Sequence, residues 1–143
     1  MAAKTTRAIA YIRSNTPTND DTGNKTSIAV QRISAYCELS RITLIEMIVD
    51  AGSMGRLDAR PSLQAGLSAL TSRRADVLIV PSLHTLSRSI AEIAPWLARH
   101  FGEGSPNDLI AMQEQIDTRQ PTGRLALGVL SALSRFDRGA RHA

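Results

Sequence analysis

The sequence predicts an α/β protein built on a mostly parallel sheet of about five strands. Short apolar runs recur along the 143 residues, and they alternate with segments whose apolar residues stand three and four apart. The run at 77–80 is the clearest strand, because four apolar residues stand directly before Pro81. With 43% apolar and 21% charged residues, the composition is that of a packed globule. We therefore expect one domain spanning residues 1–143.

Each element has its own signal in the sequence. Strands are expected at 7–12, 44–49, 77–80 and 108–112, with a short one at 115–117. Helices are expected from about Thr26, from Pro61, over 89–101 and from about residue 123. Segments 14–25, 51–59 and 102–107 are rich in polar residues and glycine and lack periodicity, so they are expected to be loops.

Apolar spacing supports the first three helices. In the first, Ala29, Ile33, Tyr36 and Cys37 fall on one face, and Thr26 is available as the N-cap. In the second, Pro61 occupies the first helical position, and Leu63, Leu67 and Leu70 follow at helical spacing. The third carries Ile90, Ile93 and Leu97 inward.

The last helix has two apolar faces. Leu125, Val129, Ala132 and Phe136 form one of them, which we expect to pack on the domain itself. Leu127 and Leu130 form the other. A surface helix needs only one apolar face, so we expect the second to bury against a partner chain. The end of this helix is basic and offers a candidate DNA contact through Arg135, Arg138 and Arg141.

The charge balance points to a phosphate-bearing partner. The formal net charge is +4, the isoelectric point is near 10.0, and 15 of the 17 basic residues are arginine. Arginine binds phosphate with two parallel hydrogen bonds, although a GC-rich genome would give the same bias. Aromatic residues make up only 3%, which argues against a base-stacking platform for single strands. If DNA is the partner, we expect contacts to its backbone phosphates.

Several classes of protein are excluded by composition. Cys37 is the only cysteine, so neither a disulfide framework nor a cysteine zinc site can form. The three histidines are scattered, and we expect no metal and no cofactor. No apolar run approaches the roughly 20 residues of a membrane span, and the first residues lack a signal-peptide core. We therefore expect a cytoplasmic protein without a membrane partner.

Five short motifs follow one another in an order typical of one family. They are Tyr-Ile-Arg-Ser-Asn-Thr at 11–16, Ser-Ile-Ala-Val-Gln-Arg at 27–32, Asp-Ala-Gly-Ser-Met-Gly at 50–55 followed by Arg-Pro-Ser-Leu at 60–63, Leu-His-Thr-Leu-Ser-Arg-Ser at 83–89, and Ile-Asp-Thr at 116–118 followed by Pro-Thr-Gly-Arg at 121–124. In these motifs the chain resembles the catalytic domain of the resolvase/invertase family of serine recombinases over nearly its whole length.

The resemblance implies a fold and a chemistry. The fold would be a three-layer α/β/α sandwich with strand order 2-1-3-4-5 and an antiparallel last strand. The chemistry would be DNA cleavage by a serine hydroxyl, which forms a phosphoserine link, followed by resealing. The residues that match the family's phosphate-binding arginines are Arg13, Arg60 and Arg88. The residues that match supporting positions are Tyr11, Gln31 and Asp50.

The match fails at the nucleophile. The family's serine position holds Asn15, whose amide cannot attack phosphorus. Ser14 is adjacent, but neighbouring side chains of a strand point to opposite faces, so Ser14 is a displaced candidate. Met54 replaces the second active-site serine, and His84 and Thr85 replace an Asp-Arg pair. Family members also carry a C-terminal helix-turn-helix domain, which we do not expect in a chain that ends at residue 143.

These observations favour one functional hypothesis and leave two others open. We expect a serine-recombinase-like domain that is catalytically inactive and acts by forming a homodimer or by pairing with another recombinase or regulator. The first alternative is an active site-specific recombinase that uses Ser14 or a partner subunit. The second is a sequence-independent DNA-binding protein that uses the basic final helix, with binding that falls steeply as salt rises.

Overall fold

The computed structural model describes residues 5–14, 20–51 and 55–142, with side chains described for all of these except 20–25 and 136–142. The elements are β1 (Thr6–Ser14), α1 (Asp20–Leu39), β2 (Ile42–Ala51), the short helix η1 (Leu57–Ala59), α2 (Pro61–Thr71), β3 (Val77–Val80), the short helix η2 (Leu83–Thr85), α3 (Ile90–Phe101), β4 (Asp108–Ala111), β5 (Ile116–Asp117) and α4 (Pro121–His142).

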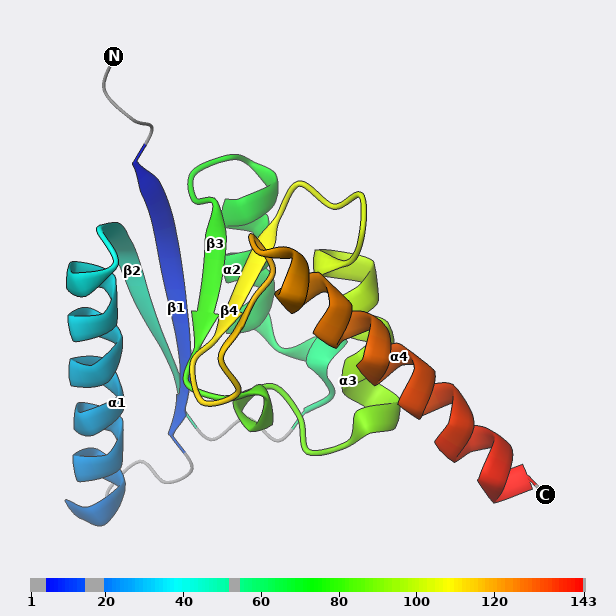
Figure 1. Cartoon of the computed structure of the whole chain (residues 1–143). Helices are drawn as coiled ribbons and strands as arrows, with labels where there is room; N and C mark the ends of the chain where they lie inside the picture. The colour runs from blue at the N-terminus through cyan, green and yellow to red at the C-terminus, as the bar shows by residue number, and fades with distance from the viewer. Residues whose placement is uncertain (1–4, 15–19, 52–54, 143) are drawn as a thin grey trace.

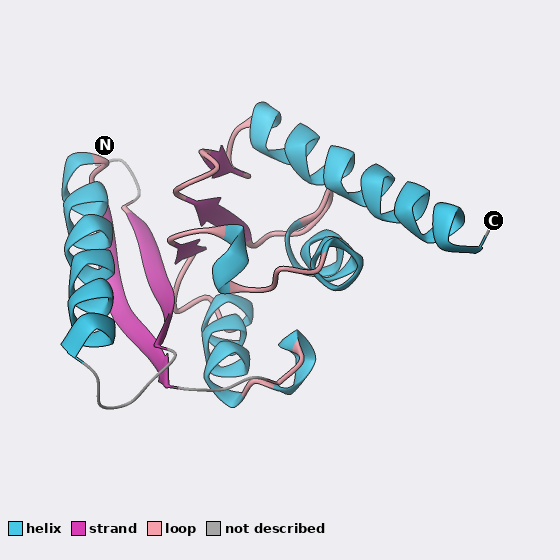
Figure 2. Ribbon diagram, turned by 90° about the horizontal axis from the view of Figure 1, so that it is seen from below, coloured by secondary structure: helices cyan, strands magenta, loops and turns pink. Residues whose placement is uncertain are grey.

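The five strands form one sheet in the order β2-β1-β3-β4-β5, in which only the β4–β5 pair is antiparallel. Helix α1 covers one face of the sheet, and α2 and α3 cover the other (Figure 2). Helix α4 packs against α3, and its second half extends away from the body of the domain (Figure 1). The three-layer fold, the strand order and the antiparallel last strand are thereby confirmed.

Two apolar cores lie on the two faces of the sheet. In β1, Ile9 and Tyr11 face the core under α2 and α3, whereas Ala8, Ala10 and Ile12 face the core under α1. This alternation follows from the two-residue period of a strand. β3 is buried on both faces, which explains why its sequence is continuously apolar.

Helix α1 begins at Asp20, six residues before the start expected at Thr26. Its first turns are polar and contain Gly23, so no apolar spacing marks them in the sequence. The apolar face of this helix is as predicted, since Ile33 and Cys37 are buried against the sheet. Segment 51–59, expected to be a loop, contains the short helix η1, and a second short helix, η2, follows β3.

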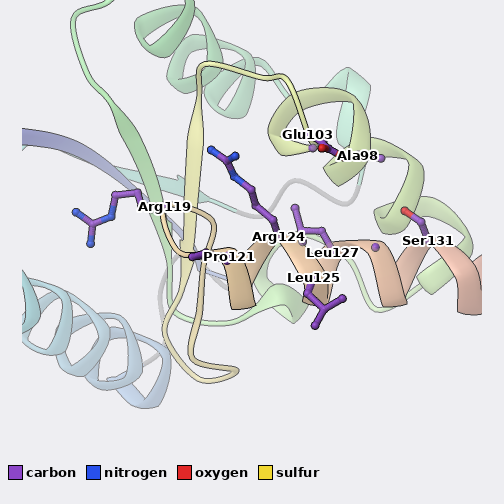
Figure 3. Close-up of a pocket in the computed structure, with 10 residues that line it drawn as sticks. Ala98, Glu103, Arg119, Pro121, Arg124, Leu125, Leu127 and Ser131 are labelled. Carbon is purple, nitrogen blue, oxygen red and sulfur yellow. The ribbon is translucent and has the colours of Figure 1, made fainter.

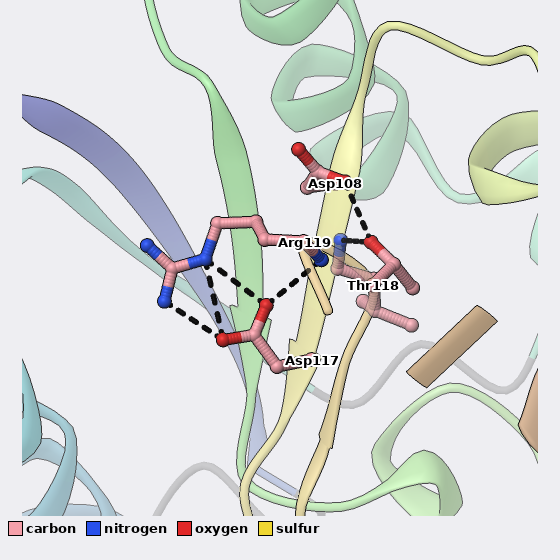
Figure 4. Close-up of polar contacts among 5 residues, drawn as sticks. Asp108, Asp117, Thr118 and Arg119 are labelled. Carbon is pink, nitrogen blue, oxygen red and sulfur yellow. Dashed lines mark hydrogen bonds and ion pairs between the residues drawn. The ribbon is translucent and has the colours of Figure 1, made fainter. Parts of the chain in front are cut away.

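Hydrogen bonds fix the chain between β4 and α4 (Figure 4). The Thr118 hydroxyl donates to Asp108 at 2.8 Å and accepts from the Leu109 amide at 2.8 Å. Next to it, the Arg119 guanidinium pairs with Asp117 at 2.7 Å. These bonds tie β5 to β4 immediately before α4 begins, and so they set the direction in which α4 leaves the sheet.

Candidate functional site

The candidate site lies where β1 and β2 end. These strands are parallel neighbours, so their carboxyl ends meet at the same edge of the sheet, and Arg13 is in register with Asp50. Alternation along β1 places Arg13 on the same face as Tyr11, toward α2. Arg60 immediately precedes Pro61, the first residue of α2, and so approaches the same face of the sheet from the helix that covers it.

Tyr11 and Asp50 form a buried hydrogen bond. The Tyr11 hydroxyl donates to Asp50 Oδ2 at 2.5 Å, and both residues are inaccessible to solvent or nearly so. Burial, with the hydrogen bond to Asp50 and its negative charge, raises the pKa of Tyr11 to about 12, and Arg60 opposes the shift. The phenol is therefore protonated at neutral pH, and it holds the Asp50 carboxylate in place.

Arg60 and Arg13 each have a buried side-chain nitrogen that makes no hydrogen bond within the described residues. Arg60 is only 4% exposed, and its Nε donates to the Gly55 carbonyl at 3.0 Å. Its Nη1 is buried, as is the Nε of Arg13, and neither atom has a hydrogen-bond partner among the described residues. Buried donors of charged groups are rarely left unpaired. Two guanidinium groups with unused donors at one edge of a sheet form a candidate anion site, suited to a phosphate.

Glu92, on the first turn of α3, belongs to the same neighbourhood. It accepts hydrogen bonds from the Ser87 hydroxyl at 2.7 Å and from the Leu57 amide at 3.2 Å. The Ser87 bond is the main cause of a lowered pKa for Glu92, and the positive charge of Arg60 adds to it. The sequence analysis did not single out Glu92. The Ser89-x-x-Glu92 capping-box pattern at the start of α3 was the available signal.

The lowered pKa of Glu92 predicts that the difference in stability between the wild type and Glu92→Gln depends on pH. In the folded protein the pKa of Glu92 lies below its ordinary value of 4.5. The ionised carboxylate therefore stabilises the fold above pH 4.5, and this stabilisation is lost as the pH falls through the folded pKa. The variant should therefore be less stable than the wild type at neutral pH, and the difference should shrink in acid. Urea unfolding across this pH range measures it, and a difference that does not vary with pH would contradict the assignment.

Of the other positions singled out from the motifs, Arg88, Gln31 and Ser14 lie within the described residues, and Asn15 and Met54 lie outside them. Arg88 is exposed in the turn before α3, next to Ser87. Gln31 is exposed on α1, which covers the opposite face of the sheet. Ser14 is the last residue of β1, in register with Ala51, and alternation directs it toward the α1 face. Asn15 and Met54 lie outside the described residues.

Helix α4 has the two predicted apolar faces, but the face expected to be buried is exposed and the face expected to be exposed is buried. Leu127 is buried in the domain core and Leu130 packs against it, so these residues do not face a partner. Leu125 and Val129, expected to be buried, are exposed instead. Both faces are similarly apolar, and the direction in which the preceding turn sends the helix decides between them.

A groove of about 590 Å³ lies between the end of α3 and the start of α4 (Figure 3). Leu127 and Gly128 from α4 and Ala98 from α3 line its apolar part. Arg124 also lines it, and its Nε donates to the Thr118 carbonyl at 3.0 Å. Of the basic residues predicted at the end of α4, Arg135 is exposed, and the side chains of Arg138 and Arg141 lie outside the described part of the chain.

Two features are absent from the described residues. They contain no cluster of three or more His, Cys, Asp or Glu side chains that could hold a metal ion. Within the same ranges, every helix is too short or too polar to cross a membrane.

The fold is that of a serine recombinase catalytic domain. The sequence model of the family described as "Resolvase, N terminal domain" matches residues 8–142, and the chain belongs to this family. The N-terminal catalytic domain of TP901-1 integrase is similar in structure, with a TM-score of 0.83 and 27% identity over 94% of this chain and 98% of that one.

A resolvase family site-specific recombinase from Streptococcus pneumoniae shares the fold as well. Its TM-score is 0.75, with 19% identity over 96% of this chain and 91% of that one. No curated protein sequence matches the chain.

Proposed function

We propose that this domain does not cleave DNA and acts by association, either with a second copy of itself or with another recombinase or regulator. The observation that carries the first part is the position of Ser14. It ends β1 on the α1 face of the sheet, whereas Tyr11 and Arg60 lie on the opposite face. A serine that attacks a phosphate must approach from the side on which the arginines bind it. Ser14 faces away from that side.

The chemistry of the neighbouring positions supports the same proposal. Asn15 stands where the family's motif has its serine, and an amide nitrogen is not a nucleophile. Thr85 stands where the family has another arginine. Loss of one group that stabilises a transition state costs on the order of a hundredfold in rate, and loss of the nucleophile removes the covalent route. Arg13 and Arg60 would then remain as a site that still binds phosphate or sulfate.

The exposed face of α4 supports association. Leu125, Val129 and Leu133 stand four residues apart, so they form one stripe along the helix. They are 69%, 51% and 49% exposed. Helix α4 also extends beyond the body of the domain, where a second chain can reach it (Figure 1). A contiguous apolar stripe on a projecting helix is typical of a protein–protein interface. The same helix from a second copy would cover it symmetrically.

Negative charge introduced by substitution on the stripe of Leu125, Val129 and Leu133 should abolish self-association. Val129→Glu with Leu133→Glu places two carboxylates in the proposed interface, and the protein should then sediment as a monomer while the wild type sediments as a dimer or larger species. Leu39→Glu is the matched control, because Leu39 is 85% exposed on α1, away from α4. Sedimentation equilibrium measures all three proteins. A wild type that is strictly monomeric at high concentration, and that binds no related recombinase, would contradict the association proposal.

A further inference from the structure

A group of exposed arginines lies at the end of the sheet opposite the candidate site. Arg41 is the last residue before β2, and Arg73 and Arg74 occupy the turn between α2 and β3. β2, β1 and β3 are parallel neighbours, so all three begin at the same edge, the upper one in Figure 1. We call Arg41, Arg73 and Arg74 the amino-edge arginines.

The neighbouring residues leave these three charges uncompensated. Arg7, at the start of β1, pairs with Asp76 at 3.4 Å and donates to the Arg73 carbonyl at 2.7 Å, so it holds the turn in place. All three amino-edge arginines are exposed, and none has an ion-pair partner within the described ranges. A second carboxylate, that of Glu38 in the last turn of α1, is close in sequence to Arg41 but forms no ion pair with it.

The backbone at two of these positions favours a different residue. Arg41 has φ of 58° and Arg73 has φ of 67°, a left-handed conformation in which a side chain is strained. Each ends a helix and leads into a strand, where glycine is the preferred residue. The exposed side chains of Arg41 and Arg73 contribute no buried contact that would offset this strain. The fold alone therefore does not account for arginine at either position.

The arrangement is that of a row. Adjacent strands are about 4.8 Å apart, so the starts of β2 and β3, on either side of β1, lie about 10 Å apart along the edge. Arg41 directly precedes β2, and Arg73 and Arg74 lie in the turn that leads into β3. Arg73 also borders a polar hollow of about 480 Å³ that is lined by Arg99, His100 and Glu103, and Arg99 is paired with Asp58 at 3.7 Å. An extended row of exposed guanidinium groups fits a linear polyanion better than a small ligand, which needs converging donors.

We propose that the amino-edge arginines bind the phosphate backbone of duplex DNA, at a surface separate from Arg13 and Arg60. Duplex DNA carries one negative charge per about 1.7 Å of its axis, so neighbouring phosphates are available to a row of this length. The contact is independent of sequence, because guanidinium groups on phosphates do not read bases. This surface does not depend on association through α4, and the two are tested by different measurements.

The test is the salt dependence of binding to a labelled duplex of arbitrary sequence, followed by fluorescence anisotropy. In Arg41→Gly with Arg73→Gly, the slope of log K against log salt should fall in magnitude by about 1.8, because each lost phosphate contact contributes about 0.9. Glycine suits both backbone positions, so the melting temperature of this variant should equal or exceed that of the wild type. Loss of binding therefore cannot result from unfolding.

The charge-matched control is Arg32→Gln with Arg56→Gln, which removes one exposed arginine from α1 and one from the segment just before η1. It should retain most of the wild-type slope. The proposal is overturned if the wild type does not bind the duplex at low salt or binds only anionic vesicles. It is equally overturned if the glycine variant keeps the wild-type slope, or if the control loses as much slope as that variant.

Discussion

Replacement of Gly123 by alanine is expected to destabilise the domain by about 3 kcal/mol, near the upper end of the cost of overpacking. Gly123 lies in the first turn of α4, and a Cβ atom there would collide with the carbonyl oxygen of Asp117 and with the amide of Thr118. Both partners are backbone atoms, and Thr118 is tied to β4 through its hydroxyl. Neither can move aside cheaply, so α4 would have to shift on the domain.

The same helix supplies a control. Gly128 lies in the middle of α4, and a Cβ atom there would meet nothing within 4 Å. Gly128→Ala should therefore stabilise the protein by about 0.5–1 kcal/mol, the usual cost of glycine inside a helix. Urea unfolding of the two variants measures the contrast. Equal effects of the two substitutions would contradict the packing described at the start of α4.

Arg60→Gln is expected to cost about 2 kcal/mol, within the range for the loss of a hydrogen bond made by a charged group. Arg60 is 4% exposed, and its positive charge acts on both Tyr11 and Glu92. Without it, the Tyr11 hydroxyl and the Glu92 carboxylate both lose a neighbouring positive charge. Arg60→Lys should be intermediate, since lysine keeps the charge but not the planar fork that reaches Gly55.

Arg56→Gln is the matched control, because Arg56 lies close in sequence but is exposed. It should change the free energy of unfolding by less than about 0.5 kcal/mol. Added sulfate should raise the melting temperature of the wild type and of Arg56→Gln, but not that of Arg60→Gln. A sulfate effect that survives in Arg60→Gln would remove Arg60 from the anion site.

Most of the fold was predictable because its signals are local. The apolar run of β3 and the spacing of Ile33 and Cys37 in α1 reflect which side chains become buried. Pro61 marks the start of α2 because its fixed φ suits the first helical position. The strand order required the family resemblance, because no local pattern reports which strands are neighbours. The start of α1 was missed, since residues 20–25 include no apolar residue that would mark a helix in the sequence.

The candidate site was predictable in part. Tyr11, Asp50 and Arg60 came from the motifs, and their contacts unite them. Glu92 was missed because its partners are 5 and 35 residues away in the sequence, which no spacing rule detects. The outward face of α4 was assigned to Leu127 instead of Leu125, because the choice depends on the turn at 117–121 and not on the helix itself.

Covalent trapping on DNA tests most directly the central claim that this domain does not cleave. The wild type, Ser14→Ala and an active serine recombinase as positive control are incubated with a pool of nicked suicide duplexes. Protein–DNA adducts are then resolved on a denaturing gel. We expect an adduct from the positive control and none from the wild type or Ser14→Ala. A wild-type adduct that disappears in Ser14→Ala would contradict the claim and establish Ser14 as the nucleophile.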